Sequence, residues 1–249
     1  MVAHEKRNSG QLFCTVPTRN DLALSSLLFS AQPTQKLGYP FPGSPPLDGS
    51  CRLPYNGAKP PPPSPGEERT YTMKKALIVV DMQKDFVDGS LGTPAAQSIV
   101  PAVVEKIRAF RGDALLVTLD THGADYLQTL EGKKLPVPHC IKGTPGHALH
   151  SEIQAALSGK PHTLVENNTF GSFDVARLLA ERFPGETPEI KLVGLCTDIC
   201  VLSNALLLRA AFPNAPITVD ARCCAGVTED AHRAALTAMQ SCQIDILAL

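Results

Sequence analysis

From Met73 onward, short apolar runs rich in β-branched residues alternate with segments in which apolar residues recur at helical spacing. This alternation is typical of a parallel sheet covered by helices on both faces, because parallel strands need long crossover connections. We therefore predict an α/β domain over residues 73–249, a three-layer α/β/α sandwich of Rossmann-like form with a six-stranded parallel sheet. The expected strands are 76–81, 114–119, 162–166, 190–195, 217–220 and 243–246. The expected helices are 99–110, 147–157, 172–183, 198–212 and 229–240.

The first 72 residues have a different composition. They hold twelve of the 22 prolines, including the run from Pro60 to Pro63, and they show neither strand nor helix periodicity over any useful length. Proline-rich sequence lacks backbone donors and favours extended conformations over a packed core. We predict a disordered Pro-rich extension over residues 1–72. An alternative is that Met73 is the natural start and that the preceding residues are not native.

Composition excludes several classes of protein. The formal net charge of −1 gives no basic excess for nucleic acid, and no apolar run approaches the roughly 20 residues that a membrane span requires. The eight cysteines lie in a chain too long to need disulfides for stability. We expect reduced thiols in a cytoplasmic protein without nucleic-acid or membrane partners.

Three of the predicted strands end in residues that carry chemistry. Asp81 ends the first strand, Asp120 and His122 follow the second, and Cys196 and Cys200 follow the fourth. Ligands of open parallel sheets bind beyond the carboxyl ends of the strands, so these side chains should converge on one crevice. Cys200 would lie in the first turn of a helix, where free N–H groups favour a thiolate. The alternative is a cysteine that serves as a small buried hydrophobe.

Three sequence runs resemble one family. VVDMQKDFVDGSL from Val79, PHCIKGTPG from Pro138 and GLCTDICV from Gly194 are similar to the nicotinamidase-like branch of the isochorismatase-type cysteine hydrolases. The resemblance covers residues 73–246 and implies an isochorismatase-like fold. It also implies that Cys200 is the nucleophile and that Asp81 takes its proton, although an aspartate at a strand end can instead be a cap. The backbone N–H groups of Cys196 and Cys200 would form the oxyanion hole, with a cis peptide bond between Leu195 and Cys196.

The chain departs from the family pattern at one catalytic position. The family has a lysine six residues before the second phenylalanine of a motif like KNTFGSF, and here Asn167 stands in its place. No lysine lies within six residues of Asn167 on either side. An amide can donate a hydrogen bond, but it carries no charge to hold a carboxylate and a thiolate together. The loss of such a group typically costs roughly 100- to 1000-fold in rate.

The resemblance also implies a divalent metal and no organic cofactor. Asp120, His122 and His139 match three of the ligands in nicotinamidases, and this set suits zinc, iron or manganese. The remaining histidine of the family pattern falls near Gln128, a poor ligand, so water or Glu131 would take the fourth position. The alternative is that both histidines only form hydrogen bonds in a polar cleft.

Phe86 aligns with an aromatic residue that flanks the substrate ring in the family, although a phenylalanine after a strand is often core. We expect Cys140, Cys223 and Cys224 to be core residues, with metal binding or redox chemistry as alternatives.

These observations predict a cysteine-dependent hydrolase of a small carboxamide, which releases ammonia through a thioester on Cys200. The resemblance alone makes nicotinamide the leading substrate. A second hypothesis is a ligand-binding member of the family that is catalytically weakened because Asn167 replaces the lysine. A third, thiol–disulfide exchange by Cys196 and Cys200, is disfavoured because the spacing is C-x-x-x-C. Exposed helices on an α/β domain also favour a homo-oligomer.

Overall fold

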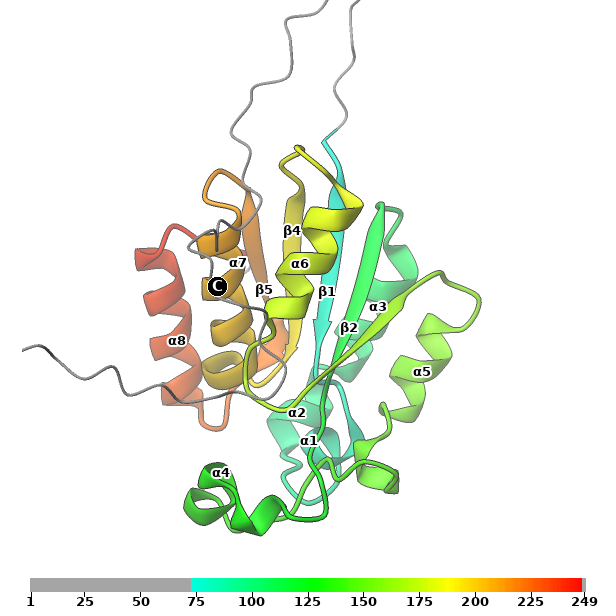
Figure 1. The fold of residues 1–249 in the computed structure, drawn as a ribbon, viewed down its shortest axis with the longest axis vertical. Helices are drawn as coiled ribbons and strands as arrows, with labels where there is room; N and C mark the ends of the chain where they lie inside the picture. Colours follow the sequence, from blue (N-terminus) through cyan, green and yellow to red (C-terminus); the bar gives the residue numbers. More distant parts are fainter. Residues whose placement is uncertain (1–72, 248–249) are drawn as a thin grey trace, which may run out of the picture. The chain divides into compact units, whose positions relative to one another are not determined.

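The computed structural model describes residues 73–247, which form the predicted α/β sandwich around one six-stranded sheet (Figure 1). The strand order is β3-β2-β1-β4-β5-β6, and all five pairings are parallel. The strands are β1 (Lys75–Val80), β2 (Ala114–Asp120), β3 (Thr163–Asn167), β4 (Glu189–Leu195), β5 (Ile217–Ala225) and β6 (Asp245–Leu247). The prediction for residues 1–72 lies outside the described residues.

Helices cover both faces of the sheet, which explains why the central strands read as nearly continuous apolar runs. Every residue of β2 is buried, and so are five of the six residues of β1. One face packs against α6 (Phe173–Arg182), α7 (Leu202–Ala211) and α8 (Glu229–Ser241). The opposite face packs against α3 (Val100–Ala109) and α5 (Ser151–Leu157).

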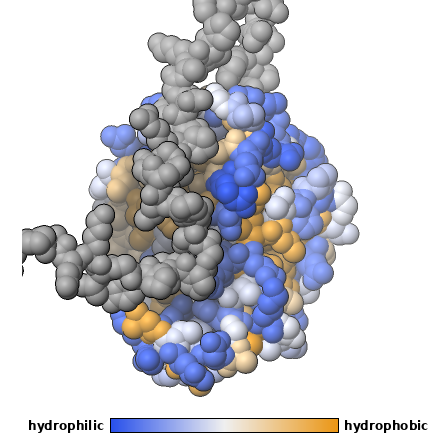
Figure 2. Space-filling view, in the orientation of Figure 1, coloured by the Kyte–Doolittle hydropathy of each residue, from blue (hydrophilic) through white to orange (hydrophobic). Residues whose placement is uncertain are grey.

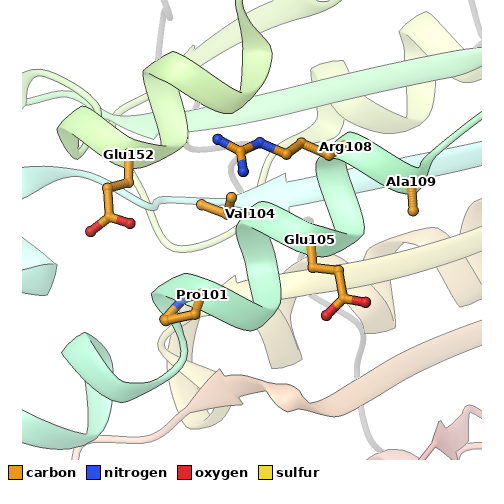
Figure 3. A pocket seen from close by; sticks show the side chains of 6 residues that line it. All are labelled: Pro101, Val104, Glu105, Arg108, Ala109 and Glu152. Atoms are coloured by element: carbon orange, nitrogen blue, oxygen red, sulfur yellow. The ribbon is translucent and has the colours of Figure 1, made fainter.

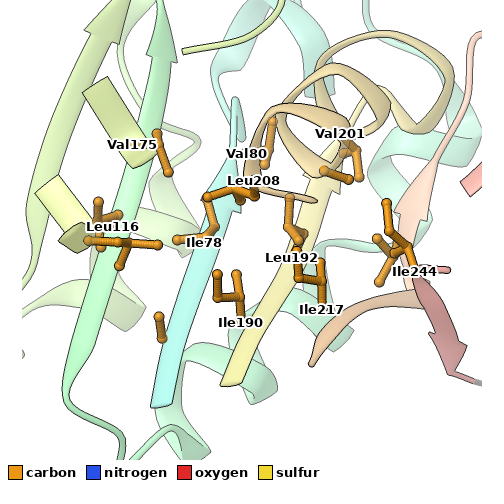
Figure 4. Close-up of a cluster of buried hydrophobic side chains, with 14 of the residues drawn as sticks. Ile78, Val80, Leu116, Val175, Ile190, Leu192, Val201, Leu208, Ile217 and Ile244 are labelled. Atoms are coloured by element: carbon orange, nitrogen blue, oxygen red, sulfur yellow. The ribbon is translucent and has the colours of Figure 1, made fainter. Parts of the chain in front are cut away.

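Alternating residues of β1, β2 and β4 belong to two separate cores, as period-2 side-chain geometry requires. On the face of α7, Ile78, Leu192 and Ile217 of three different strands lie in one cluster with Leu208 (Figure 4). Leu77, on the other face, packs in a second cluster that contains α3 and α5 residues. The sheet is therefore the buried middle layer of the sandwich.

Several short helices lie beyond the predicted elements. They fill the two long connections that follow β1 and β2, and Figure 1 shows α1, α2 and α4 at the end of the sheet toward which these strands run. They are α1 (Lys84–Val87), α2 (Pro94–Ser98), η1 (Tyr126–Gln128), α4 (Leu130–Lys134) and η2 (Pro145–His147). Helices of three to five residues show too little periodicity to be predicted from sequence.

Several predicted elements differ from the structure at their ends; the helix predicted over 147–157, for example, begins at Ser151. The helix predicted from residue 198 begins as a π-helical turn, η3 (Thr197–Val201), before regular α7 geometry starts at Leu202. The strand predicted to stop at Asp220 continues to Ala225, and its pairing with β4 shifts register between Leu192 and Gly194. The exposed Arg222 interrupts the apolar pattern of β5, so the sequence pattern predicts only the first half of the strand.

The surface drawn in Figure 2 is mostly hydrophilic, with apolar residues showing between the polar ones. Among residues 73–247, no helix combines the length and the apolar character that crossing a bilayer would need.

Candidate active site

Asp81 follows β1 directly, at the end of the sheet where the sequence predicts the site. Its side chain is fully buried, and its φ of 47° is in the left-handed region that non-glycine residues seldom adopt. The backbone N–H of Asp81 donates to Thr118 Oγ1 over 3.2 Å, and the Thr118 hydroxyl donates to Asp81 Oδ1 over 2.5 Å. This reciprocal pair fixes the carboxylate against the neighbouring strand β2.

Burial dominates the ionisation of Asp81. It raises the pKa of the carboxyl group to about 7, because the charged form loses its hydration. The Thr118 hydrogen bond opposes this rise, the nearby Asp120 charge adds to it, and the Cys200 thiol that faces the carboxylate lowers it again. Asp81 can therefore exchange a proton with a neighbour near neutral pH.

Cys200 lies in the π-helical turn η3, with its side chain 6% exposed. Burial and then the Asp81 charge raise the pKa of its thiol well above the ordinary value. This differs from our expectation that the start of a helix would favour a thiolate, because desolvation outweighs the helix effect here. A neutral thiol facing a carboxylate is an arrangement in which the carboxylate can act as the base.

The turn that carries Cys200 is held on both sides. A cis peptide bond joins Leu195 to Cys196, which confirms the expectation from the resemblance. Thr197 Oγ1 lies 2.8 Å from His232 Nδ1 of α8, and Asp198 Oδ1 accepts a hydrogen bond from the backbone N–H of Val227. The loop after β5 and the helix α8 thus position the turn.

A buried asparagine connects this turn to the loop after β3. The side-chain amide of Asn204, on α7, donates to the carbonyl oxygens of Cys200 over 2.9 Å and Phe170 over 3.3 Å. Its Oδ1 accepts from the backbone N–H of Ser172 over 3.1 Å. The loop that follows β3 is therefore tied to the turn that carries Cys200.

Asn167 is the last residue of β3 and pairs with Asp120 in the sheet. Its Nδ2 donates to the Thr169 carbonyl over 2.6 Å, and its Oδ1 is buried and has no hydrogen-bond partner among the described residues. No hydrogen bond joins Asn167 to Asp81 in this part of the chain. The amide therefore does not take over the contact that a lysine would make.

Asp120, His122 and His139 form the predicted cluster, and one ligand atom from each lies within 4.8 Å of the others. Asp120 Oδ2 is 3.0 Å from His122 Nε2 and 3.4 Å from His139 Nε2. Glu131 Oε1 is 3.7 Å and 3.6 Å from the same two nitrogens. Water and Glu131 were the two alternatives for the fourth metal ligand, and in the structure the Glu131 carboxylate lies beside the cluster.

The donor set fits a divalent cation. His139 Nδ1 lies 2.8 Å from the Val137 carbonyl, which requires a proton on Nδ1 and leaves the Nε2 lone pair facing the cluster. His122 Nε2 is buried and makes no hydrogen bond despite its closeness to Asp120. Two carboxylates and two imidazole nitrogens that face one point are typical of zinc and related metals.

Gln83, which the sequence did not single out, connects the segment after β1 to Asp120 and His147. Its side chain is fully buried; Nε2 donates to the carbonyl oxygens of Asp120 and His147, and Oε1 accepts from the Asp120 N–H over 2.8 Å. Asp85 similarly accepts from the backbone N–H of Cys140 over 2.8 Å. A buried polar residue inside an apolar run, such as Thr118 in β2, is the signal that could have identified such groups.

Aromatic rings surround the histidine pair. Tyr126 packs against His122 and His139 with centroid distances of 4.7 Å and 4.9 Å, and its hydroxyl donates to the Leu135 carbonyl. Phe86 lies 5.4 Å from the His139 ring. The aromatic residue that the resemblance assigns to substrate binding is therefore beside the cluster.

The remaining described cysteines are not paired. Cys140, Cys223 and Cys224 are buried and Cys242 is exposed, and all six cysteines between residues 73 and 247 are free thiols. Burial raises the pKa of Cys223 to about 11, which keeps that thiol neutral at physiological pH. These observations favour the core interpretation for Cys223 and Cys224, which belong to the two core clusters. Cys140 belongs to neither cluster, and its thiol lies beside Asp120.

A depression of about 530 Å³ lies elsewhere, between α3 and α5 (Figure 3). Its lining includes Glu105, Arg108 and Glu152. It contains none of the predicted site residues.

The buried charge of Asp81 leads to a stability prediction. Because its folded pKa is raised from 3.8 to about 7, the folded state keeps a proton that the unfolded chain loses, and stability should fall as pH rises from about 4 to 7. Asp81→Asn should therefore raise the free energy of unfolding of chelator-treated protein at pH 8 by roughly 3 to 4 kcal/mol. At pH 4 the two proteins should be equally stable. Urea titration at both pH values measures the difference, and an equal gain at pH 4 would contradict the assignment to ionisation.

Comparisons with known proteins give the class of this chain. The isochorismatase domain model matches residues 75–248. In sequence, the uncharacterized isochorismatase family protein PncA of Bacillus subtilis is 35% identical over 147 residues, which cover 54% of this chain and 78% of that protein. The chain belongs to the isochorismatase family, and its runs and neighbours place it with the nicotinamidase-like members.

Solved structures agree with this placement. The nicotinamidase/pyrazinamidase PncA from Bacillus subtilis superposes with a TM-score of 0.64 at 29% identity, covering 71% of this chain and all of that one. The pyrazinamidase of Pyrococcus horikoshii, solved in complex with zinc, gives a TM-score of 0.60 at 25% identity and covers 71% of this chain and 99% of that one.

Proposed function

We propose that this protein hydrolyses a small primary carboxamide through a thioester on Cys200 and releases ammonia. The observation that carries the proposal is the buried Asp81–Cys200 pair beside the cluster of Asp120, His122 and His139. The solved neighbour named as a nicotinamidase/pyrazinamidase supports an aromatic amide such as nicotinamide as the substrate.

In the first half-reaction, Asp81 takes the proton of the Cys200 thiol as sulfur attacks the carbonyl carbon of the amide. The carbonyl oxygen becomes negative and would accept hydrogen bonds from the backbone N–H groups of Cys196 and Cys200. Asp81 then returns the proton to the amide nitrogen, the C–N bond breaks, and ammonia leaves. The product of this half-reaction is an acyl thioester on Cys200.

In the second half-reaction, Asp81 accepts a proton from water, and the water oxygen attacks the thioester carbonyl. The C–S bond breaks, the Cys200 sulfur regains the proton, and the carboxylic acid leaves. The burial that raises the Asp81 pKa to about 7 suits a group that both accepts and donates a proton in each cycle.

Asp120, His122, His139 and Glu131 would hold a divalent metal beside this reaction centre. When bound, such an ion supplies Lewis acidity and open coordination positions for a water or a substrate atom. Zinc is supported by the zinc complex of the Pyrococcus horikoshii neighbour. Phe86 would pack against a ring held at this position, because its ring already lies against His139.

A second candidate function is ligand binding with little turnover. The observation that favours it is Asn167, whose amide donates to Thr169 and not to Asp81. Without a cation beside the carboxylate, the buried Asp81–Cys200 pair has less stabilisation for the negative charge that moves between its members.

Ammonia release from a panel of primary amides, with zinc and after chelation, tests the proposal. We expect turnover of at least one aromatic amide, lowered at least about tenfold by chelation and restored by zinc. His139→Ala should lower the rate with zinc present, whereas Cys242→Ala, at an exposed thiol, serves as the matched control. Saturable binding of an amide without ammonia release would favour the binding function.

A further inference from the structure

Strand β1 ends before its neighbour β2 does. The last pairing between the two strands joins Val79 to Val117, whereas β2 continues to Asp120 and pairs there with Asn167 of β3. Buried backbone groups need hydrogen-bond partners. The end of β2 therefore needs a group that takes the place of a strand on the side of β1.

The side chain of Gln83 takes this place. Its Oε1 accepts from the Asp120 N–H over 2.8 Å, and its Nε2 donates to the Asp120 carbonyl oxygen over 2.8 Å and to the His147 carbonyl oxygen over 2.9 Å. The reverse orientation of the amide would place its oxygen against two carbonyl oxygens, so the hydrogen bonds fix the orientation. One buried amide thus binds both backbone groups of Asp120.

The backbone of Gln83 is itself held in place. Gln83 is the N-cap residue of α1, and its carbonyl oxygen accepts from the N–H groups of Phe86 over 3.2 Å and Val87 over 3.0 Å. It also forms an antiparallel bridge with Leu149. A side chain that is fixed at its base and fully buried can fix the group that it binds.

The position of Asp120 decides the geometry of the proposed metal ligands. Its Oδ2 lies 3.0 Å from His122 Nε2 and 3.4 Å from His139 Nε2. A binding site loses much of its function when one of its groups moves by about 1 Å. The hydrogen bonds that hold the Asp120 backbone therefore bear on the affinity of the cluster for a metal ion.

Gln83 also reaches the segment that carries His139. The His147 carbonyl that accepts from Gln83 belongs to the connection that follows His139. Within this connection, Ile141 forms a parallel bridge with His122. The amide therefore joins the start of α1 to both the end of β2 and the segment after His139.

We propose that Gln83 is a positioning residue of the metal site, whose amide holds the Asp120 carboxylate and the His139 segment in the geometry that binds a divalent ion. The inference rests on the metal site of the proposed function and does not depend on amide hydrolysis. Gln83 acts through the backbone of a ligand residue and not by touching the ion. Groups that orient metal ligands typically contribute roughly 10- to 100-fold in metal affinity.

Zinc affinity of the full-length protein tests the inference without an activity assay. The protein is first treated with a chelator, and the zinc dissociation constant is then measured by competition with a chromogenic chelator. Gln83→Met, which is similar in length but has no amide, should weaken zinc binding about 10- to 100-fold. Cobalt(II) bound to this variant should also show a changed visible absorption spectrum, because the ligand geometry changes.

A second variant covers the case in which Gln83→Met does not fold. Gln83→Asn keeps the amide but is one methylene shorter, so it cannot make the same three hydrogen bonds. It should weaken zinc binding at least about fivefold, with a smaller loss of stability than the methionine variant because its buried side chain stays polar.

Two controls separate positioning from general destabilisation. Gln154→Met makes the same substitution at an exposed position of α5 and should leave zinc binding unchanged. Leu208→Ala removes a buried side chain from the cluster that α7 shares with the sheet. It should lower the melting temperature and leave the zinc dissociation constant of the folded protein within about twofold. A purely structural role of Gln83 predicts the same result for Gln83→Met.

Zinc binding within about fivefold of the unchanged protein, in whichever Gln83 variant folds, would overturn the inference and leave the hydrolase proposal standing. If zinc binding weakens as expected but no amide is hydrolysed, the hydrolase proposal fails and the positioning role stands. If the unchanged protein binds no zinc, both the inference and the proposed metal site are wrong.

Discussion

Cys200→Ala is expected to abolish amide hydrolysis, lowering kcat by roughly four orders of magnitude or more, because no other group can form the thioester. The variant should still fold, since Cys200 is a small buried residue within the apolar cluster that α7 shares with the sheet. It should also still bind the amide. Ammonia release and thermal unfolding of the purified variant measure the two properties separately.

Cys196→Ala is the matched control for this prediction. Cys196 lies four residues earlier in the same turn, and its proposed role uses the backbone N–H, which alanine retains. Burial raises the pKa of both thiols, but of the two only the Cys200 thiol is hydrogen-bonded to the Asp81 carboxylate that can take its proton. The variant should keep activity within about tenfold of the unchanged protein. Equal loss of activity in both variants would refute the assignment of Cys200 as the nucleophile.

The sheet could be predicted from the sequence because its strands are buried on both faces. A run such as Ala114–Asp120, with every residue buried, carries an apolar signal that no loop produces. The candidate site residues at the strand ends could also be identified from the sequence, because Asp81 and Asp120 each end an apolar run. The convergence of their ends then follows from the general rule for parallel sheets, whereas the order of the strands is known only from the structure.

The contacts that support the site could not be predicted, because they join residues that lie far apart in the chain. In the sequence, Gln83 is an ordinary polar residue after a strand. Its hydrogen bonds to the Asp120 backbone, 37 positions later, exist only in the folded chain. Asn204 and Thr118 are similar cases. The π-helical turn at Cys200 and the neutral state of its thiol depend on packing around η3, which no local pattern encodes.

At Asn167, the sequence pattern and the structure each supply a different observation. The pattern identifies the position, and the structure adds that the amide donates to Thr169 and leaves a buried oxygen unpaired. A side chain that was only a weakened substitute for lysine would be expected to contact Asp81. The Asn167 amide instead donates within its own segment, so it does not take the place of the lysine beside Asp81.

Asn167→Lys is expected to raise the hydrolysis of neutral amides by roughly 10- to 1000-fold, the range that one preorganised charge can supply. The lysine ammonium would lie beside Asp81 and stabilise the carboxylate and the thiolate in turn. The charge should also lower the pKa of the Cys200 thiol, so that iodoacetamide labels it at lower pH than in the unchanged protein.

The competing outcome for Asn167→Lys is a buried charge without a partner, which would destabilise the fold. Asp81 makes this outcome less favourable, because its buried carboxylate could pair with the ammonium group. Asn167→Met, similar to lysine in length but neutral, is the matched control and should not raise the rate. If Asn167→Lys leaves both the rate with neutral amides and the thiol reactivity unchanged or lower, the missing lysine does not limit this site, and Asn167 has a role that depends on its amide.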